Sequence, residues 1–182
     1  MAQENRKSLR TGVFIDGSNL FWGSRRSGIE IDFEKLREYL KVRFDPVVFN
    51  YYACEDNDPR DPVALKRAYK RKKFLNFLEG IGYRVIRKGL KHLVGGVTKC
   101  DMDIELTMDM RNYEDDLDCI ILFTGDSDFL SVVQYYWAKG KIIRIFSFGT
   151  GLSWELKTFA LTHPGASYIT IESIRDEVER RK

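Results

Sequence analysis

Five aspartates beside short apolar runs are the residues of this sequence best suited to chemistry. Asp16 ends the run TGVFID, Asp126 and Asp128 follow the run CIILF within TGDSDF, and Asp101 and Asp103 lie in KCDMD. Any one of these carboxylates could simply cap the helix that follows it. Gathered at one place, they would repel one another unless a cation neutralised them. The pattern therefore favours a cation site built from carboxylates.

Histidine and cysteine usage narrows the choice of metal. The chain has only two histidines, His92 and His163, so a histidine-based metal cage is nearly excluded. Its three cysteines are far apart and have no CxxC spacing, which predicts reduced thiols rather than a disulfide framework or a zinc site. They are Cys54, Cys100 and Cys119. Carboxylate oxygens suit Mg²⁺ or Mn²⁺, and these ions support phosphoryl transfer by activating water.

The elements that would position these carboxylates follow from the spacing of apolar residues. The expected strands are 11–16, 46–53, 83–87, 119–124, 142–148 and 168–171, and the expected helices are 33–42, 63–79, 103–111, 127–138, 153–161 and 172–182. Residues 88–98 are rich in glycine and predict a loop or an irregular hairpin. This alternation predicts a three-layer α/β/α fold with a central, mostly parallel, Rossmann-like sheet. Sites in such sheets lie at the carboxyl ends of the strands, where Asp16 and Asp126 are expected.

Length and composition set the frame for that fold. The 182 residues, 43% hydrophobic and 31% charged, suit one globular domain, which we expect over 11–182, after a flexible basic arm at 1–10. No apolar run approaches the roughly 18–20 residues of a membrane span, and the polar start does not resemble a secretory signal. We therefore expect a cytoplasmic protein with no membrane partner. Exposed residues of the strand 47–53 or of the last helix are candidates for pairing two copies into a homodimer.

Basic residues are concentrated in one expected helix. Residues 66–73 contain six positive charges and no acid, whereas residues 101–118 contain eight acids and one base. A solvated helix face accounts for the basic cluster as well as a phosphate-binding ridge does. A carboxylate site repels phosphate, however, so a phosphodiesterase needs positive charge nearby. The candidate nucleic-acid contacts are Lys66, Arg67, Lys70, Arg71, Lys73 and Lys99.

Three motifs together resemble a known family. FIDGSNL at 14–20, KCDMDIELTMDM at 99–110 and TGDSDF at 124–129 are similar, in this order, to motifs of the NYN domain, a PIN-like nuclease fold. The strand IIRIFSF followed by GTGLSWELKTFA resembles the closing segment of that family, so the resemblance covers about 11–172. It implies a metal-dependent ribonuclease that acts on RNA with a 5′-phosphate product. It also implies that Asp16, Asp103, Asp126 and Asp128 form the acidic metal-binding set.

The resemblance assigns one further role and leaves one choice open. Asn19 would be the polar partner that orients a carboxylate, a water or the phosphate. The family commonly has Lys, Gly, a hydrophobic residue and then Asp, whereas here Lys99 is followed by CDMD. Alignment of the helix favours Asp103 as the ligand, and the spacing from Lys99 leaves Asp101 as the alternative. Asp109 lies six residues beyond Asp103, about 240° around the helix, which predicts a structural or solvated carboxylate.

Two other functions remain open from the sequence. A non-catalytic RNA-binding or adaptor module could use the same fold, although retention of all four acids favours an enzyme. A phosphatase of the haloacid dehalogenase type would use a nucleophilic Asp with a second Asp two residues later. Position 18 is serine here, which disfavours that alternative.

Overall fold

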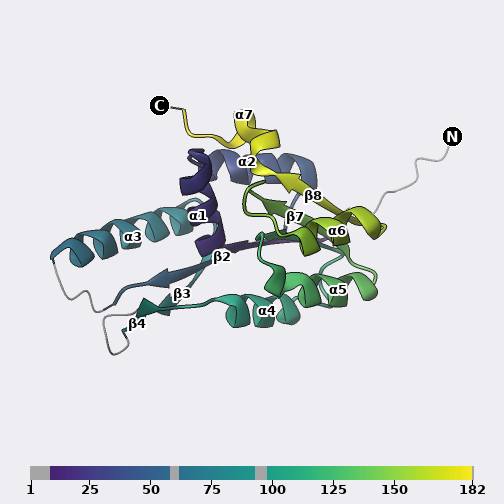
Figure 1. The fold of residues 1–182 in the computed structure, drawn as a ribbon, viewed down its shortest axis with the longest axis horizontal. Helices are drawn as coiled ribbons and strands as arrows, with labels where there is room; N and C mark the ends of the chain where they lie inside the picture. The colour runs from purple at the N-terminus through teal and green to yellow at the C-terminus, as the bar shows by residue number, and fades with distance from the viewer. Residues whose placement is uncertain (1–8, 58–61, 93–97, 182) are drawn as a thin grey trace.

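A six-stranded parallel sheet forms the centre of the molecule (Figure 1). The computed structural model describes residues 9–57, 62–92 and 98–181. The strand order is β3-β2-β1-β6-β7-β8, and every neighbouring pair is parallel. The strands are β1 (Thr11–Asp16), β2 (Val48–Glu55), β3 (Arg84–Gly89), β6 (Cys119–Phe123), β7 (Ile142–Ser147) and β8 (Ala166–Thr170). The prediction of a mostly parallel sheet is confirmed.

Helices cover both faces of this sheet, because successive strand residues point to opposite faces. Val13 and Ile15 of β1 belong to one apolar cluster, and Phe14 between them belongs to a second. The first cluster includes residues of α1 (Gly17–Ser27), α2 (Phe33–Phe44), α3 (Pro62–Gly80) and α7 (Arg175–Val178). The second includes residues of α4 (Asp103–Asn112), α5 (Leu130–Ala138) and α6 (Trp154–Thr162). The three-layer α/β/α architecture is therefore confirmed.

The middle strands are the most deeply buried, as their continuous apolar sequences require. All residues of β1 and β6 are buried. The two strands pair in register from Thr11 opposite Cys119 to Ile15 opposite Phe123. Asp16 and Thr124, the residues that follow the last pair, thus leave the sheet at the same edge. This edge is where the sequence places the acidic residues.

Three expected elements differ from the observed ones. The last helix was expected over 172–182, but the chain forms a 3₁₀ turn, Ile171–Ile174, and then the short helix α7. Only Ile171, Ile174 and Val178 of this segment pack into the core, so no long apolar stripe supports a longer helix. The helix expected over 127–138 begins with a 3₁₀ turn at Ser127–Phe129. Helix α1 follows Asp16 directly and was not among the expected helices.

The expected loop or hairpin at 88–98 is partly visible. Strands β4 (Lys91–His92) and β5 (Thr98–Lys99) pair antiparallel, and residues 93–97 between them lie outside the described residues. Most of the predicted arm at 1–10 also lies outside them, so the division into an arm and one domain stays a prediction. No described helix has the length and apolar character needed to cross a membrane.

A disulfide corrects the prediction of three reduced cysteines. Cys54 near the end of β2 is bonded to Cys100, with 6.1 Å between their Cα atoms, and Cys119 is a buried free thiol. The two bonded residues are 46 positions apart in sequence, so their spacing gave no sign of the pair. Proximity arises because β2 extends past Asp16 to meet the segment that precedes α4.

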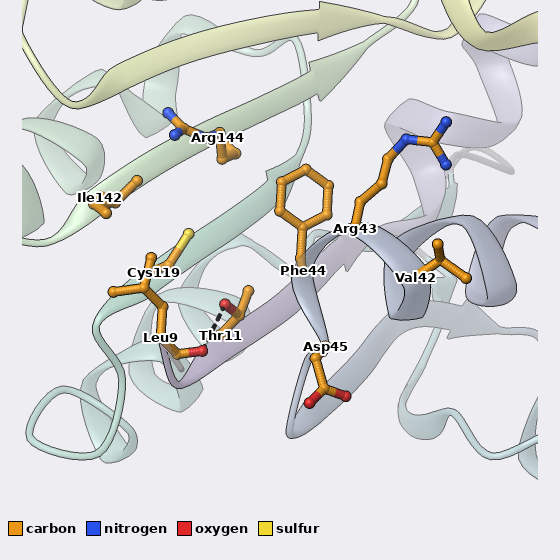
Figure 2. A pocket seen from close by; sticks show the side chains of 9 residues that line it. All are labelled: Leu9, Thr11, Val42, Arg43, Phe44, Asp45, Cys119, Ile142 and Arg144. Atoms are coloured by element: carbon orange, nitrogen blue, oxygen red, sulfur yellow. Dashed lines mark hydrogen bonds between the residues drawn. The ribbon is translucent and has the colours of Figure 1, made fainter. Parts of the chain in front are cut away.

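A small pocket opens at the opposite edge of the sheet (Figure 2). Thr11, Cys119 and Ile142, which are the first residues of β1, β6 and β7, form part of its wall together with Arg43 and Arg144. Its volume is about 260 Å³. Parallel sheets bind their ligands at the carboxyl ends of strands, so this pocket is not the expected site.

Candidate active site

Asp16 links β1 to α1 at the carboxyl edge of the sheet. It is the N-cap of α1, and its Oδ1 accepts hydrogen bonds from the backbone N–H groups of Ser18 (2.9 Å) and Asn19 (3.0 Å). Burial raises the pKa of Asp16; the two N–H groups oppose this, and the charges of Asp126 and Asp101 add to it. The side chain thus combines a capping role with an unfavourable negative environment.

Glycines let the chain turn tightly beside the carboxylates. A Cβ atom at Gly17 would lie 2.5 Å from the carbonyl oxygen of Tyr52 in β2. A Cβ atom at Gly125 would overlap the carbonyl oxygen of Gly151 in the loop after β7. Both glycines are therefore required by close backbone approach rather than by chain flexibility. Gly17 brings the start of α1 against β2, and Gly125 brings the loop after β6 against the loop after β7.

Asn19 joins two of these loops. Its Oδ1 accepts a hydrogen bond from the backbone N–H of Gly125 at 3.1 Å. Gly125 in turn accepts a hydrogen bond on its carbonyl oxygen from the N–H of Ser153, the N-cap of α6. Asn19 therefore holds the loop that carries Asp126 against the start of α1. This contact gives Asn19 a positioning role through the backbone.

Asp126 and Asp128 lie in the turn after β6. Asp126 caps the 3₁₀ turn, and its Oδ1 accepts a hydrogen bond from the N–H of Asp128 at 3.0 Å. Thr124 supports the turn from inside, because its hydroxyl accepts a hydrogen bond from the N–H of Asp126. Both carboxylates are exposed, so they are open to an external ligand.

Asp103 reaches the same edge from the start of α4. Its backbone N–H donates to Oδ1 of Asp101 at 2.9 Å, which places the two carboxylates in one turn. Met102 between them is buried in the second apolar cluster and anchors the start of the helix. Burial raises the pKa of Asp103 to about 7, and the charges of Asp101, Asp16 and Asp126 contribute to this rise.

Three predicted ligands converge. Carboxylate oxygens of Asp103, Asp126 and Asp128 lie within 4.8 Å of one another. Asp16 is not one of these three, and its negative charge contributes to the raised pKa of Asp103. We call the four residues Asp16, Asp103, Asp126 and Asp128 the acidic centre. Asp103 rather than Asp101 belongs to the converging group, in line with the preferred alignment.

The acidic centre has no cationic partner within the part of the chain that the structure describes. None of its four carboxylates forms a salt bridge there, and neither does Asp101. Burial and, after it, the negative charges of Asp101, Asp16 and Asp126 raise the pKa of Asp103. All donors are carboxylate oxygens at the edge of the sheet, and a hard divalent cation fits such a set.

The predicted nucleic-acid contacts lie on α3 and β5. Lys66, Arg67, Lys70, Lys73 and Lys99 are exposed. Figure 1 shows α3 reaching outward along the side where β2 and β3 end. No described carboxylate forms a salt bridge with any of these five residues.

Arg71 differs from the other basic residues of α3. It is half-buried on the row that also carries Leu75 and Leu78, which faces the sheet. Burial raises the pKa of the buried Tyr51 to about 12, and the charge of Arg71 limits this rise. The Tyr51 ring also borders Gly17, next to Asp16. Arg71 is thus the predicted basic contact that lies on the sheet side of α3, where its charge acts on Tyr51.

Sequence reasoning missed the Cys54–Cys100 pair at this edge. A signal was present: Cys54 follows the expected strand 46–53, and Cys100 immediately precedes the acidic motif. Both positions therefore adjoin the expected carboxyl edge, although the cysteines were predicted to be reduced thiols. Their contact required the register of β2 against β1, which the sequence does not provide.

The fold and the site together define a class, a parallel α/β protein with clustered carboxylates at the carboxyl edge of its sheet. The sequence matches the profile of the NYN domain over residues 10–163, and the chain belongs to the NYN domain family. It is 28% identical over 178 residues to the low amplitude and bright protein LabA of Synechococcus elongatus, which covers 94% of this chain and 88% of that protein.

A solved structure supports the fold independently. The chain is similar to a crystal structure of a protein of unknown function from Vibrio parahaemolyticus, with a TM-score of 0.73 and 21% identity. The match covers 98% of this chain and 99% of the other. At this identity the similarity concerns the architecture alone.

Proposed function

We propose that this protein is a Mg²⁺- or Mn²⁺-dependent ribonuclease that hydrolyses RNA phosphodiester bonds at the acidic centre. The observation that carries the proposal is the convergence of Asp103, Asp126 and Asp128 within 4.8 Å, with no described cation to neutralise them. Membership of a family of PIN-like nucleases supports the same reaction class. A bound divalent cation would activate a water and stabilise negative charge on the phosphate.

Each residue of the proposed site would have a distinct role. Asp103, Asp126 and Asp128 would hold the cation through their carboxylate oxygens. Asp16 adds negative charge beside them while its Oδ1 remains committed to the two N–H groups of α1. Asn19 keeps the Asp126 loop at the correct distance through its hydrogen bond to Gly125.

Positive charge beside the sheet edge would bring RNA to this acidic site. The exposed basic residues of α3, for which the structure describes no acidic partner, would supply sequence-independent attraction for the phosphate backbone. Arg71 would add a charge on the sheet side of the same helix, beside Tyr51. Lys99 adds a cation on β5, one residue before Cys100. Metal and phosphate would thus be bound by separate groups of residues on neighbouring elements.

The test compares wild-type protein with Asp126→Asn and with the control Asp116→Asn. Asp116 is an exposed carboxylate in the turn after α4 and is not part of the acidic centre. Wild type and Asp116→Asn should cleave labelled RNA with Mn²⁺ and lose activity in EDTA, whereas Asp126→Asn should bind RNA without cleaving it. Equal cleavage by Asp126→Asn and wild type would refute the site.

The same assay separates the enzyme from a non-catalytic module on this fold. RNA binding by the wild type without any Mn²⁺-dependent cleavage or thermal stabilisation would favour the RNA-binding or adaptor alternative. The length and terminal phosphate of the products would show whether cleavage is internal and whether it leaves a 5′-phosphate.

A further inference from the structure

The Cys54–Cys100 disulfide joins two segments that form the acidic edge. Cys54 lies two residues beyond Tyr52, which pairs in register with Asp16. Cys100 immediately precedes Asp101, the first acid of the motif that leads into α4. The covalent bond therefore ties the outer end of β2 to the segment that delivers Asp101 and Asp103.

The other restraints that the structure describes on this segment are noncovalent. Strand β5 pairs with β4 through two described residue pairs, and Nζ of Lys88 donates to the carbonyl oxygen of Asp101 at 2.8 Å. Oδ1 of Asp101 accepts a hydrogen bond from the backbone N–H of Asp103 at 2.9 Å. The next firm anchor is the buried side chain of Met102. Between β5 and Met102 the disulfide is thus the strongest restraint on Cys100 and Asp101. Its loss would release these residues more than it would release α4.

Asp101 matters because its charge acts on the acidic centre. Its Oδ1 accepts a hydrogen bond from the backbone N–H of Asp103 at 2.9 Å, and its charge contributes to the raised pKa values of both Asp16 and Asp103. A negative charge held beside a carboxylate cluster strengthens attraction for a cation, and the same charge on a mobile segment contributes less. The disulfide therefore holds an extra carboxylate at the point where it supports cation binding.

We propose that Cys54–Cys100 is a reversible thiol–disulfide modification site, whose oxidised form binds a divalent cation more tightly at the acidic centre than its reduced form. The reductant would be a small dithiol, because both sulfur atoms belong to half-buried residues at the sheet edge. One thiolate of the reductant attacks a sulfur atom of the Cys54–Cys100 disulfide and forms a mixed disulfide. The reductant's second thiol then attacks that mixed disulfide, which releases the protein thiol and closes the reductant's own disulfide. Two electrons and two protons pass to Cys54 and Cys100.

The inference rests on the cation site of the proposed function but not on ribonuclease activity. The measurement is therefore Mn²⁺ affinity, obtained by electron paramagnetic resonance detection of free Mn²⁺. Protein prepared without reductant is compared with protein treated with dithiothreitol and desalted without oxygen. Reduction should weaken Mn²⁺ binding about three- to tenfold, the size expected when one nearby charge is lost from a solvated site.

Hydrogen exchange gives a readout that does not depend on metal. Reduction should speed exchange of the backbone N–H groups of residues 99–101 while leaving those of β6 unchanged. Iodoacetamide labelling with mass measurement reports the disulfide itself. Without reductant and without unfolding, Cys54 and Cys100 should stay unlabelled.

Matched variants separate the disulfide from a general effect of reductant. Cys54→Ser and Cys100→Ser should each show the weaker affinity with and without dithiothreitol, whereas Cys119→Ser should keep the full response. Asp101→Asn should retain the disulfide but lose most of the difference in affinity between the two forms. The comparison of oxidised and reduced wild type stands even where a serine variant fails to fold.

Three outcomes would overturn the inference. Labelling of Cys54 and Cys100 in protein prepared without reductant would show that no disulfide forms. Equal Mn²⁺ affinity in the two forms would remove the redox effect while leaving the proposed cation site intact. Absence of Mn²⁺ binding in both forms would overturn the cation site and the inference together.

Discussion

Carboxylates of two kinds lie on and just beyond helix α4. Asp103 at its start belongs to the acidic centre and has no cationic partner among the described residues. Asp109, six residues later, accepts hydrogen bonds from the Tyr52 hydroxyl (3.0 Å) and from Arg84 (3.1 Å). Asp109 is therefore neutralised by a partner within the fold, whereas Asp103 is left to an external cation.

Glu114, beyond the end of α4, is the clearest neutralised acid. Lys139 and Arg111 form salt bridges with it at 2.8 and 2.7 Å, and Tyr135 donates a hydrogen bond. The hydrogen bond from Lys139 contributes most to lowering the pKa of Glu114. The pKa of Asp103 is shifted in the opposite direction, to about 7. Partners rather than acid content thus distinguish a candidate cation site from a structural one.

The largest expected effect is on RNA cleavage, and it tests the contrast between Asp103 and Asp109 on the same helix. Asp103→Asn should reduce Mn²⁺-dependent RNA cleavage by about a hundredfold or more, because loss of a metal ligand costs at least as much as loss of its supporting contacts. Asp109→Asn is the matched control and should keep cleavage within about threefold of wild type at a temperature where it is folded. Comparable losses in both variants would show that the contrast has no functional meaning.

Basic residues extend the comparison, since those of α3 have no described acidic partner whereas Lys139 is paired. Removing the exposed charges of Lys66, Lys70 and Lys73 together should weaken single-stranded RNA binding about tenfold at low salt. It should also lower the slope of log affinity against log salt by about 2. Lys139→Ala should leave that slope unchanged. An unchanged slope in the triple variant would support the alternative of a solvated helix face.

The sequence predicted the roles that depend on neighbouring residues better than those that depend on residues distant in the chain. The capping role of Asp16 could be read from the sequence, because a cap is formed by residues adjacent in sequence. The edge at which Asp16 and Asp126 meet was also predictable, because parallel strands end their buried runs at one edge.

Partners distant in sequence were not predictable. The contact of Asp109 with Tyr52 spans 57 residues, and the bond of Cys54 to Cys100 spans 46. Each depends on the register of β2 and on where α4 packs beneath the sheet. Helical geometry correctly separated Asp109 from Asp103, but it could not supply the partner that makes Asp109 structural.

The same two substitutions should affect stability in the opposite order, with the larger loss at Asp109. Asp109→Asn removes a charged acceptor from a half-buried network of Tyr52 and Arg84, and should lower the free energy of unfolding by about 1–3 kcal/mol. Asp103→Asn relieves repulsion, so it should leave the metal-free protein as stable as wild type or more stable. Urea unfolding in EDTA measures both. A large destabilisation by Asp103→Asn would mean that this carboxylate has a structural partner.

The smallest expected effect is the change of the free energy of unfolding with pH. This change has opposite signs for the two kinds of carboxylate. The pKa of Asp103 rises from its ordinary 3.8 to about 7, so between those values the folded protein holds a proton that the unfolded chain releases. The free energy of unfolding of the metal-free protein should therefore fall as pH rises from about 4 to about 7. The raised pKa of Asp16 contributes in the same direction.

Glu114 should behave in the opposite way, because its pKa is lowered from 4.5 and its contribution is lost as pH falls below that value. Urea unfolding from pH 4 to 8 in EDTA should thus show a decline toward neutral pH that is reduced in Asp103→Asn and retained in Glu114→Gln. Saturating Mn²⁺ should reverse the decline, because cation binding replaces the proton on Asp103. If the free energy of unfolding declines equally in Asp103→Asn and wild type, another group holds the proton. Asp103 would then not be the residue that distinguishes unneutralised from neutralised acids.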